Sequence, residues 1–195
     1  MAGCEDMPEQ AIPNLLCYEV LIGPHDAVFD WPMLDERTAS SLCYTSGTTG
    51  NPKGVLYSHR STLLHASMAC MTDGMGMAAR DMLFMAAPMF HVNAWGMPYA
   101  CALSGASIYS AMKAERVTVA LGVPTVWMGF QQHVAAQGLQ PREDLCLERV
   151  LIGGAAAPRA VVETFANQFG TRVLHTWGMT ETSPLVTLAN PLRKH

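Results

Sequence analysis

The chain has 195 residues, of which half are hydrophobic and only 14% are charged, and its formal net charge is -4. This composition is too apolar for a disordered chain, and without a basic stripe it excludes a polyanion-binding surface, so we expect no nucleic-acid partner. The length predicts a single domain. The six cysteines are scattered without a CxxC pair, and we interpret them as reduced and mostly buried.

Short apolar runs bounded by glycine, proline and polar residues alternate along the chain with segments of helical spacing. In chain order, the pattern predicts strands at 39–44 and 54–58, a helix from Ser58 or Ser61 to about Met71, a strand at 81–87 and a helical segment at 94–103. Further along it predicts strands at 106–109 and 117–122, a helix at 124–136, a strand at 149–152, a helix at 158–169 and a strand at 172–176. This alternation is typical of an α/β domain with a mainly parallel sheet flanked by helices, whose ligand-binding loops lie at the carboxyl ends of the strands.

Residues 82–112 contain no formally charged side chain, a run longer than the roughly twenty residues that a membrane-spanning helix needs. Pro88, Pro98, His91 and Asn93 interrupt this run, and such groups are costly in lipid. We therefore expect a buried strand, loop and helix, no transmembrane segment, and at most peripheral contact with a membrane. The amino-terminal stretch MAGCEDMPEQ is acidic and lacks an apolar core, so we do not interpret it as a signal peptide.

Residues 42–54 read LCYTSGTTGNPKG and combine three glycines, four serine or threonine hydroxyls and one lysine. The backbone N–H groups of such a loop are free to point inward, and with hydroxyl donors and an ammonium group they form a cradle for a polyphosphate. The loop is not a Walker A loop, because Pro52 occupies the place of the glycine that precedes the lysine. The candidate phosphate-binding residues are Thr45, Ser46, Gly47, Thr48, Thr49, Gly50 and Lys53.

This loop resembles, position for position, the phosphate loop of the adenylate-forming (AMP-binding) superfamily. Three later segments resemble other motifs of that family, in the family's order: an acyl-pocket segment at 88–96 (PMFHVNAWG), an adenine-binding loop at 153–158 (GGAAAP) and the aromatic-Gly-x-Thr-Glu motif at 175–181 (HTWGMTE). The chain is most similar to the medium- and long-chain fatty-acyl-CoA synthetases. That resemblance implies a cytoplasmic ligase that joins a fatty acid to ATP as an acyl-adenylate, releases pyrophosphate and transfers the acyl group to CoA, with Mg²⁺ as the metal ion.

The resemblance also implies roles for the matched residues. Lys53 would supply a charge to the phosphates, Thr180 would hydrogen-bond the α-phosphate and Glu181 would hold Mg²⁺, which makes these three the candidate catalytic residues. Trp177 would stack on the adenine, and the other candidate nucleotide-binding residues are Gly154, Ala155, Ala156, Thr176, Gly178 and Met179. His91 would border the carboxylate pocket, whose other candidate residues are Val92, Asn93, Trp95 and Gly96.

The resemblance covers only the middle of the family's large domain. We expect residues 30–195 to form a partial AMP-binding domain without the C-terminal lid domain, after an unassigned segment at 1–29. No segment matches the family's later ribose-binding acid or its lid lysine. Two alternatives therefore stay open. One is a catalytically inactive nucleotide-binding fragment, and the other is a different adenylate-forming enzyme, such as a peptide-synthetase adenylation domain, whose pocket would want an acidic residue for the substrate amine.

About seven residues separate the strand expected to end near Tyr109 from the strand expected to begin at Val117, whereas a parallel crossover needs about ten or more. The family has a longer stretch here that contains a helix, and residues 114–118 resemble only its end. We infer an internal deletion of about twenty residues, which would leave one face of the sheet uncovered. The alternative is an antiparallel or rearranged pairing of these strands.

Overall fold

The computed structural model describes residues 13–45, 50–109, 112 and 114–189, which fall into two units divided after Leu34. The described part of the first unit contains one short helix, α1 (Tyr18–Ile22), and an edge-to-face pair formed by the rings of Phe29 and Trp31. Cys17 is disulfide-bonded, so the expectation of reduced cysteines is wrong at that position. The second unit contains four free cysteines among its described residues, namely Cys43, Cys70, Cys101 and Cys146.

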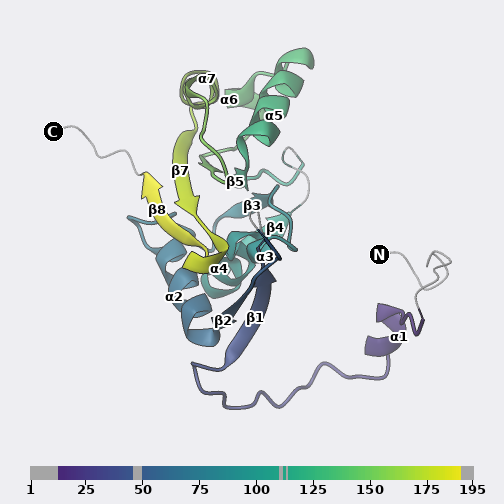
Figure 1. Cartoon of the computed structure of the whole chain (residues 1–195). Helices are drawn as coiled ribbons and strands as arrows, with labels where there is room; N and C mark the ends of the chain where they lie inside the picture. The colour runs from purple at the N-terminus through teal and green to yellow at the C-terminus, as the bar shows by residue number, and fades with distance from the viewer. Residues whose placement is uncertain (1–12, 46–49, 110–111, 113, 190–195) are drawn as a thin grey trace. The chain divides into compact units, whose positions relative to one another are not determined.

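The second unit is built on a six-stranded sheet in the order β4-β3-β5-β6-β7-β8 (Figure 1). Its strands are β3 (Met82–Met85), β4 (Ser107–Tyr109), β5 (Val119–Gly122), β6 (Arg149–Ile152), β7 (Arg172–Gly178) and β8 (Leu185–Ala189). Every neighbouring pair is parallel except β7 with β8, so the predicted mainly parallel α/β fold is confirmed. A separate antiparallel hairpin consists of β1 (Ala39–Tyr44) and β2 (Gly54–Ser58).

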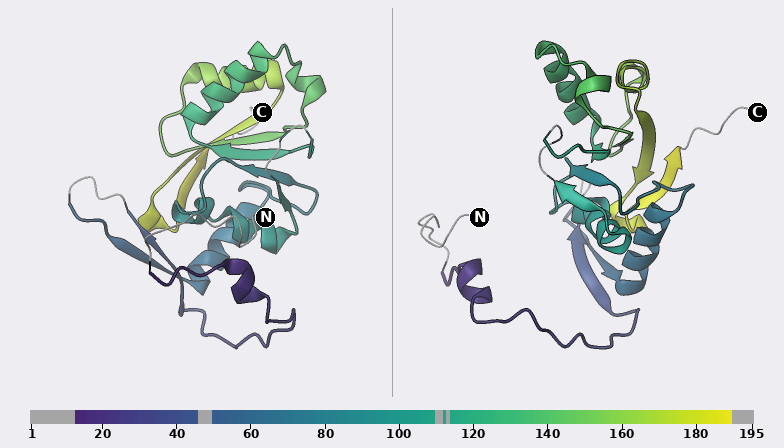
Figure 2. Two further views of the ribbon diagram at one scale, coloured as in Figure 1. Left: turned by 90° about the vertical axis from the view of Figure 1, so that its right-hand side faces the viewer. Right: turned by 180° about the vertical axis from the view of Figure 1, so that it is seen from behind.

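Helices cover both faces of the large sheet (Figures 1 and 2). One face packs against α2 (His59–Cys70) and α4 (Met97–Ser104), and the other against α5 (Pro124–Ala136), α7 (Arg159–Thr164) and the π-helical turn η2 (Phe165–Phe169). A short helix, α6 (Pro141–Asp144), follows α5. Side chains alternate between the two cores as the pleat requires, since Leu121 and Leu151 face α2 and α4 whereas Ala120 and Val150 face α5 and α7. None of the helices in the described part is long and apolar enough to cross a membrane.

Local sequence signals account for where the long helices begin. Ser58 caps α2 through a reciprocal capping box with Ser61, and proline at the first position opens α5, so both helices begin where the sequence pattern placed them. The helix expected at 158–169 begins at Arg159 but changes to π-helical winding at Phe165. Strand β8 was not predicted, because its sequence, LVTLA, does not alternate apolar and polar residues.

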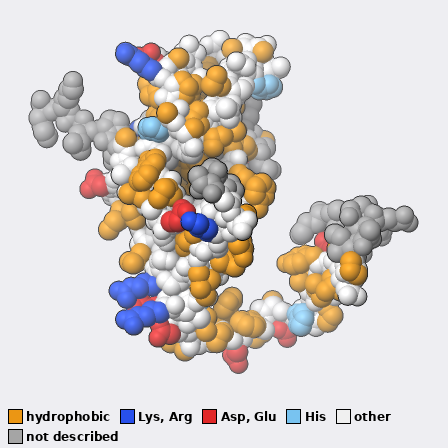
Figure 3. Space-filling view, in the orientation of Figure 1, with side chains coloured by type: hydrophobic (Ala, Val, Ile, Leu, Met, Phe, Trp, Pro, Cys, Tyr) orange, Lys and Arg blue, Asp and Glu red, His pale blue; other side chains and the backbone are white. Residues whose placement is uncertain are grey.

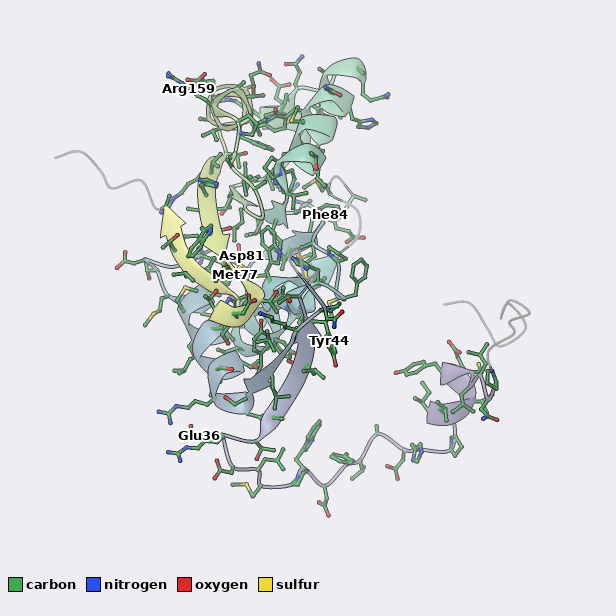
Figure 4. All side chains as sticks on the ribbon, in the orientation of Figure 1. Glu36, Tyr44, Met77, Asp81, Phe84 and Arg159 are labelled. Carbon is green, nitrogen blue, oxygen red and sulfur yellow. The ribbon has the colours of Figure 1, made fainter. Side chains whose placement is uncertain are left out.

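The connection between β4 and β5 contains no helix among its described residues, 112 and 114–118. Both strands are parallel to β3, which lies between them, so the antiparallel alternative is wrong. On β3, Leu83 is fully buried beneath α2 and α4, while Phe84 on the opposite face stays partly exposed (Figure 4). Met85, on the same face as Leu83, is also only partly buried, and the inferred deletion stays a hypothesis.

The segment before α4 winds in the left-handed sense. Residues 92–95 all have φ between +49° and +58°, and Gly96 follows at +70°. The helix expected at 94–103 is therefore wrong at its start, because the right-handed helix begins only at Met97. A left-handed conformation costs about 1–2 kcal/mol per non-glycine residue, so surrounding contacts must hold this turn. Val92 and Ala94 are buried, and the Gly96 N–H donates to the carbonyls of Val92 and Asn93.

His65 on α2 packs directly beneath the turn. A Cβ atom added to Gly96 would lie 2.7 Å from Nδ1 of this imidazole, so the contact requires glycine for space as well as for its positive φ. His65 is only 8% exposed, and its Nε2 has no hydrogen-bond partner in the described part of the chain. Burial lowers the pKa of His65 below its ordinary value, so the neutral form is favoured in the folded chain.

A buried ion pair joins the amino ends of three neighbouring strands. Arg149, the first residue of β6, pairs with the carboxylate of Asp81, which precedes β3 (Figure 4). The same guanidinium donates to the carbonyls of Met75 (2.9 Å) and Gly76 (2.6 Å). Asp81 also accepts a hydrogen bond from Thr118 Oγ1 at 3.0 Å, just before β5.

We expect Asp81→Asn to lower the free energy of unfolding by about 3 kcal/mol or more, because it leaves the buried guanidinium without its counter-charge. The control is Glu163→Gln, which breaks the exposed Arg159–Glu163 pair on α7 and should cost less than about 0.5 kcal/mol. Urea unfolding followed by circular dichroism measures both. Equal losses in the two variants would contradict a central role for the buried pair.

Gly96→Ala should destabilise the chain by roughly 1–3 kcal/mol, because alanine meets both the positive φ and the imidazole of His65. Gly129→Ala is the matched control, since Gly129 lies in α5 with no atom within 4 Å of an added Cβ. That change should stabilise the helix by about 0.5–1 kcal/mol. Thermal melts of the two single variants give opposite shifts if the packing is as described.

The lowered pKa of His65 predicts a loss of stability on the acid side. Below the ordinary pKa of 6.5 the unfolded chain takes up a proton at this imidazole that the folded chain resists, so the free energy of unfolding falls as the pH drops below that value. In a His65→Gln variant this contribution disappears and the decline between about pH 7 and pH 5 becomes shallower. If urea unfolding at each pH gave the same slope of unfolding free energy against pH for both proteins, His65 would not contribute to the acid-side loss of stability.

Candidate functional site

A cavity of about 490 Å³ opens at the carboxyl edge of the parallel sheet, where α/β folds usually bind ligands. Its walls come from the end of β1, the left-handed turn labelled α3 (Val92–Trp95) with the two residues before it, the loop after β6 and the region from the end of β7 to the start of β8. The lining residues are Tyr44, Thr45, Met75, Phe90, His91, Val92, Trp95, Gly154, Thr176, Gly178, Met179, Thr180, Glu181, Pro184 and Leu185.

Segments that are far apart in the sequence therefore meet at one cavity. Ten of its lining residues were singled out from the sequence, namely Thr45, His91, Val92, Trp95, Gly154, Thr176, Gly178, Met179, Thr180 and Glu181. The structure places them together, and their individual roles stay predictions. The other lining residues are mostly apolar, and Met75 gave no sequence signal because it lies in an irregular loop after α2.

The phosphate loop is closed at its base by contacts between Thr45 and Lys53. The Thr45 N–H donates to the Lys53 carbonyl at 2.9 Å, and the Lys53 N–H donates to Thr45 Oγ1 at 3.4 Å. Gly50 and Lys53 are exposed and do not line the cavity. The remaining loop candidates, Ser46, Gly47, Thr48 and Thr49, lie outside the described residues.

Two glycines let the backbone turn tightly beside β7. A Cβ atom on Gly153 would lie 2.3 Å from Thr176 Oγ1 and 3.1 Å from the indole ring of Trp95, and Gly154 has φ +77°. Trp95 thus lies against the loop that follows β6 while it also lines the cavity. The expected carboxylate pocket and the expected adenine loop are consequently in direct contact.

Trp177 does not line the cavity. It is 54% exposed, because Thr176 takes the inward position on β7 and the next side chain points the other way. Ala155 and Ala156 are exposed as well. A stacking face on Trp177 is therefore open to solvent at the end of β7, outside the enclosed volume.

The Thr-Glu motif forms a 3₁₀ turn, η3 (Thr180–Thr182). Thr182 Oγ1 accepts a hydrogen bond from the Met179 N–H at 2.9 Å, which fixes the start of the turn. A Cβ atom on Gly178 would lie 1.9 Å from the Pro184 carbonyl oxygen, so the chain must have glycine where it enters the motif. Thr180 is buried, and its carbonyl accepts a hydrogen bond from the hydroxyl of Tyr57 on β2.

Asn93 and Gly96 lie behind the cavity rather than on its wall. Asn93 donates from Nδ2 to Ser41 Oγ at 3.0 Å, on β1. Both residues border a second, much smaller cavity of about 10 Å³, together with Tyr57 and His65. They are thus placed to support the pocket segment, Asn93 against the hairpin and Gly96 against His65, and their role at the pocket entrance stays a prediction.

The side chains on the cavity wall suit a magnesium ion only if substrate phosphates supply the other metal ligands. Among the described residues no group of three or more His, Cys, Asp or Glu side chains could hold a metal ion. Among the described residues that line the cavity, Glu181 has the one carboxylate. Mg²⁺ is commonly bound through one or two carboxylates plus substrate phosphates, and the arrangement suits that mode.

Charged side chains do not form a continuous basic surface on the face shown in Figure 3. The Lys and Arg side chains visible on this face lie in small groups beside acidic side chains. Two exposed ion pairs of the described residues join Arg60 to Glu36 at 2.9 Å and Arg159 to Glu163 at 2.6 Å. Tyr44, labelled in Figure 4, stands at the end of β1 on the cavity wall.

Comparisons with known proteins agree with the motifs. The 3-methylmercaptopropionyl-CoA ligase of Ruegeria pomeroyi is 50% identical over 196 residues, which cover 94% of this chain and 36% of the ligase. The medium-chain-fatty-acid–CoA ligase of Ectopseudomonas oleovorans is 48% identical, with 94% of this chain and 35% of that protein covered. The crystal structure of a benzoate CoA ligase from Burkholderia xenovorans LB400 shares the fold with a TM-score of 0.74 at 24% identity, over 86% of this chain and 35% of its own.

The chain thus spans about a third of the length of these curated relatives. The alignment with the Ruegeria ligase has 196 positions, but it includes only 94% of the 195 residues of this chain. Some residues of the ligase within the aligned stretch therefore have no counterpart in this chain. A family profile described as AMP-binding enzyme matches residues 18–195. The chain therefore belongs to the AMP-binding enzyme family.

Proposed function

We propose that this chain is the nucleotide- and carboxylate-binding part of an ATP-dependent acyl-CoA ligase, an acid–thiol ligase. The observation that carries the proposal is the single cavity bordered both by Thr45, Thr180 and Glu181 and by the segment from His91 to Trp95. A ligase of this kind must bring a carboxylate to the α-phosphate of ATP, and a shared cavity lets both anions meet in a fixed geometry.

The polar part of the cavity wall supports attack of the carboxylate on the α-phosphate with pyrophosphate as leaving group. Thr180 would donate its hydroxyl to the α-phosphate, and Thr45 with the loop after it would hold the outer phosphates. Lys53 would contribute a charge from the base of that loop. Glu181 would hold Mg²⁺, which neutralises phosphate charge when it is bound. Trp177 would stack on the adenine outside the cavity, since its ring is exposed at the end of β7.

The apolar part of the wall favours a hydrophobic acyl group. Met75, Phe90, Val92, Trp95 and Leu185 surround the same space, and their side chains suit an alkyl chain of medium or long length. The relatives named for 3-methylmercaptopropionyl-CoA and for medium-chain fatty acids support a carboxylic acid with an aliphatic chain. CoA would be the acyl acceptor, with no nucleic-acid partner. Because ATP and CoA are intracellular metabolites, the cytoplasm is the proposed location, with membrane contact at most peripheral.

A second candidate is a nucleotide-binding chain without turnover. The observation in its favour is that Lys53, a candidate catalytic residue, is exposed and does not line the cavity. An amino-acid-activating enzyme is less well supported, because the one carboxylate on the described wall, Glu181, already belongs to the Thr-Glu motif.

The test is a thermal melt of the chain with and without ATP and Mg²⁺, beside a Thr180→Ala, Glu181→Ala double variant. Nucleotide at about 100 times its Kd stabilises a folded site by about 2.7 kcal/mol, a shift of several degrees, and the double variant should lose most of it. A Glu163→Ala, Thr187→Ala variant is the matched control, because both side chains are exposed and neither lines the cavity.

Equal shifts in all three proteins would contradict nucleotide binding at this cavity. Once binding is shown, pyrophosphate release with fatty acids of increasing length separates the two candidates. Release that depends on the fatty acid identifies a ligase, and binding without release identifies the inactive chain.

A further inference from the structure

The hairpin of β1 and β2 contains one cross-strand pair that contacts both halves of the site. Ser41 and Tyr57 are direct partners in the hairpin register. Tyr57 is only 7% exposed, and Ser41 is partly buried. Neither residue lines the large cavity, so the proposed reaction assigns them no contact with a substrate.

Tyr57 reaches the Thr-Glu motif through its hydroxyl group. The phenolic O–H donates to the backbone carbonyl of Thr180. Burial, with the nearby Cys43 and Glu181, raises the pKa of Tyr57, so the hydroxyl stays protonated and remains a donor. Thr180 is itself buried, and loss of the donor would leave its carbonyl without this partner.

The same pair also holds the left-handed turn. Tyr57, Cys43 and Val92 form one buried cluster. Asn93 donates from Nδ2 to Ser41 Oγ at 3.0 Å. Strained backbone persists only where its surroundings fix it, and these two contacts act on the first residues of the turn that precedes Trp95.

The space between the turn and the motif is nearly filled. Tyr57, Val92 and Asn93 border the small cavity together with Ser183, which directly follows the 3₁₀ turn. With a volume of about 10 Å³ it leaves little room for one side to move without the other.

We propose that Tyr57, with Ser41, is a positioning residue that couples occupancy of the carboxylate pocket to the geometry of the nucleotide motif. A ligand that shifts the turn at Val92 moves the Tyr57 ring, and the hydroxyl carries that shift to the Thr180 carbonyl. The coupling is reciprocal, so nucleotide at the motif favours the carboxylate-binding form of the turn to the same degree. This inference rests on the proposed function.

The first test needs no ligand. Hydrogen exchange followed by mass spectrometry compares the unmodified chain with Tyr57→Phe and with Tyr18→Phe, a control that removes the hydroxyl of an exposed tyrosine in the first unit. In Tyr57→Phe, peptides that contain residues 92–96 and 179–183 should both exchange at least about fivefold faster, while α5 is unchanged. Faster exchange in the hairpin alone, or uniformly along the chain, would overturn the proposal.

The second test measures coupling. The Kd for ATP with Mg²⁺ is determined with and without saturating dodecanoate, and the ratio in the unmodified chain should be about fivefold or more. In Tyr57→Phe the ratio should fall to near one while both ligands still bind, which a purely structural role would not produce. A ratio near one in the unmodified chain, or an unchanged ratio in the variant, would overturn the coupling. If the unmodified chain binds neither ligand, the proposed function fails for this chain, and the exchange experiment still decides whether Tyr57 links the two segments.

Discussion

The buried pair of Arg149 and Asp81 is the contact on which the rest of the second unit depends. It gathers the amino ends of β3, β5 and β6 and fixes the loop at Met75 and Gly76 through two further hydrogen bonds. Charges removed from water are retained only where partners satisfy them, and here two carbonyl oxygens bind the guanidinium while the Thr118 hydroxyl donates to the carboxylate, although Arg149 Nε finds no hydrogen-bond partner among the described residues. Because the strands are parallel and share a register, alignment of their amino ends also aligns their carboxyl ends, where the cavity lies.

The hairpin of β1 and β2 has the corresponding structural role at the carboxyl edge of the sheet, where the cavity lies. It lies outside the main sheet, yet it supplies the base of the phosphate loop and the inward-facing side chains that contact the turn and the Thr-Glu motif. Two anionic substrates repel each other in water, so a site that joins them needs its binding groups held in place before either arrives. The hairpin meets this need with neutral hydrogen bonds, which do not add charge beside the substrates.

Sequence patterns predicted the elements whose signals are local. The Ser58 capping box, the proline that opens α5 and the buried runs of β5 and β6 all depend on neighbours within a few residues. The left-handed turn was not predictable in this way, because the contacts that hold it come from β1, β2 and α2. Met75 joins the cavity wall only through tertiary packing. The exposure of Trp177 follows from the pleat of β7, which fixes the face of a side chain only once the strand register is known.

The left-handed turn also limits how the pocket can change. Glycine or asparagine at positions 92 and 94 would relax the backbone, but each would remove a buried apolar side chain that now packs against the core. Variation in substrate preference is therefore expected first at cavity side chains outside the turn, such as Met75 and Leu185, whose backbone is not left-handed. A strained segment of this kind separates the residues that fix the geometry of a pocket from those that can adjust its size, and so allows specificity to diverge while the scaffold stays the same.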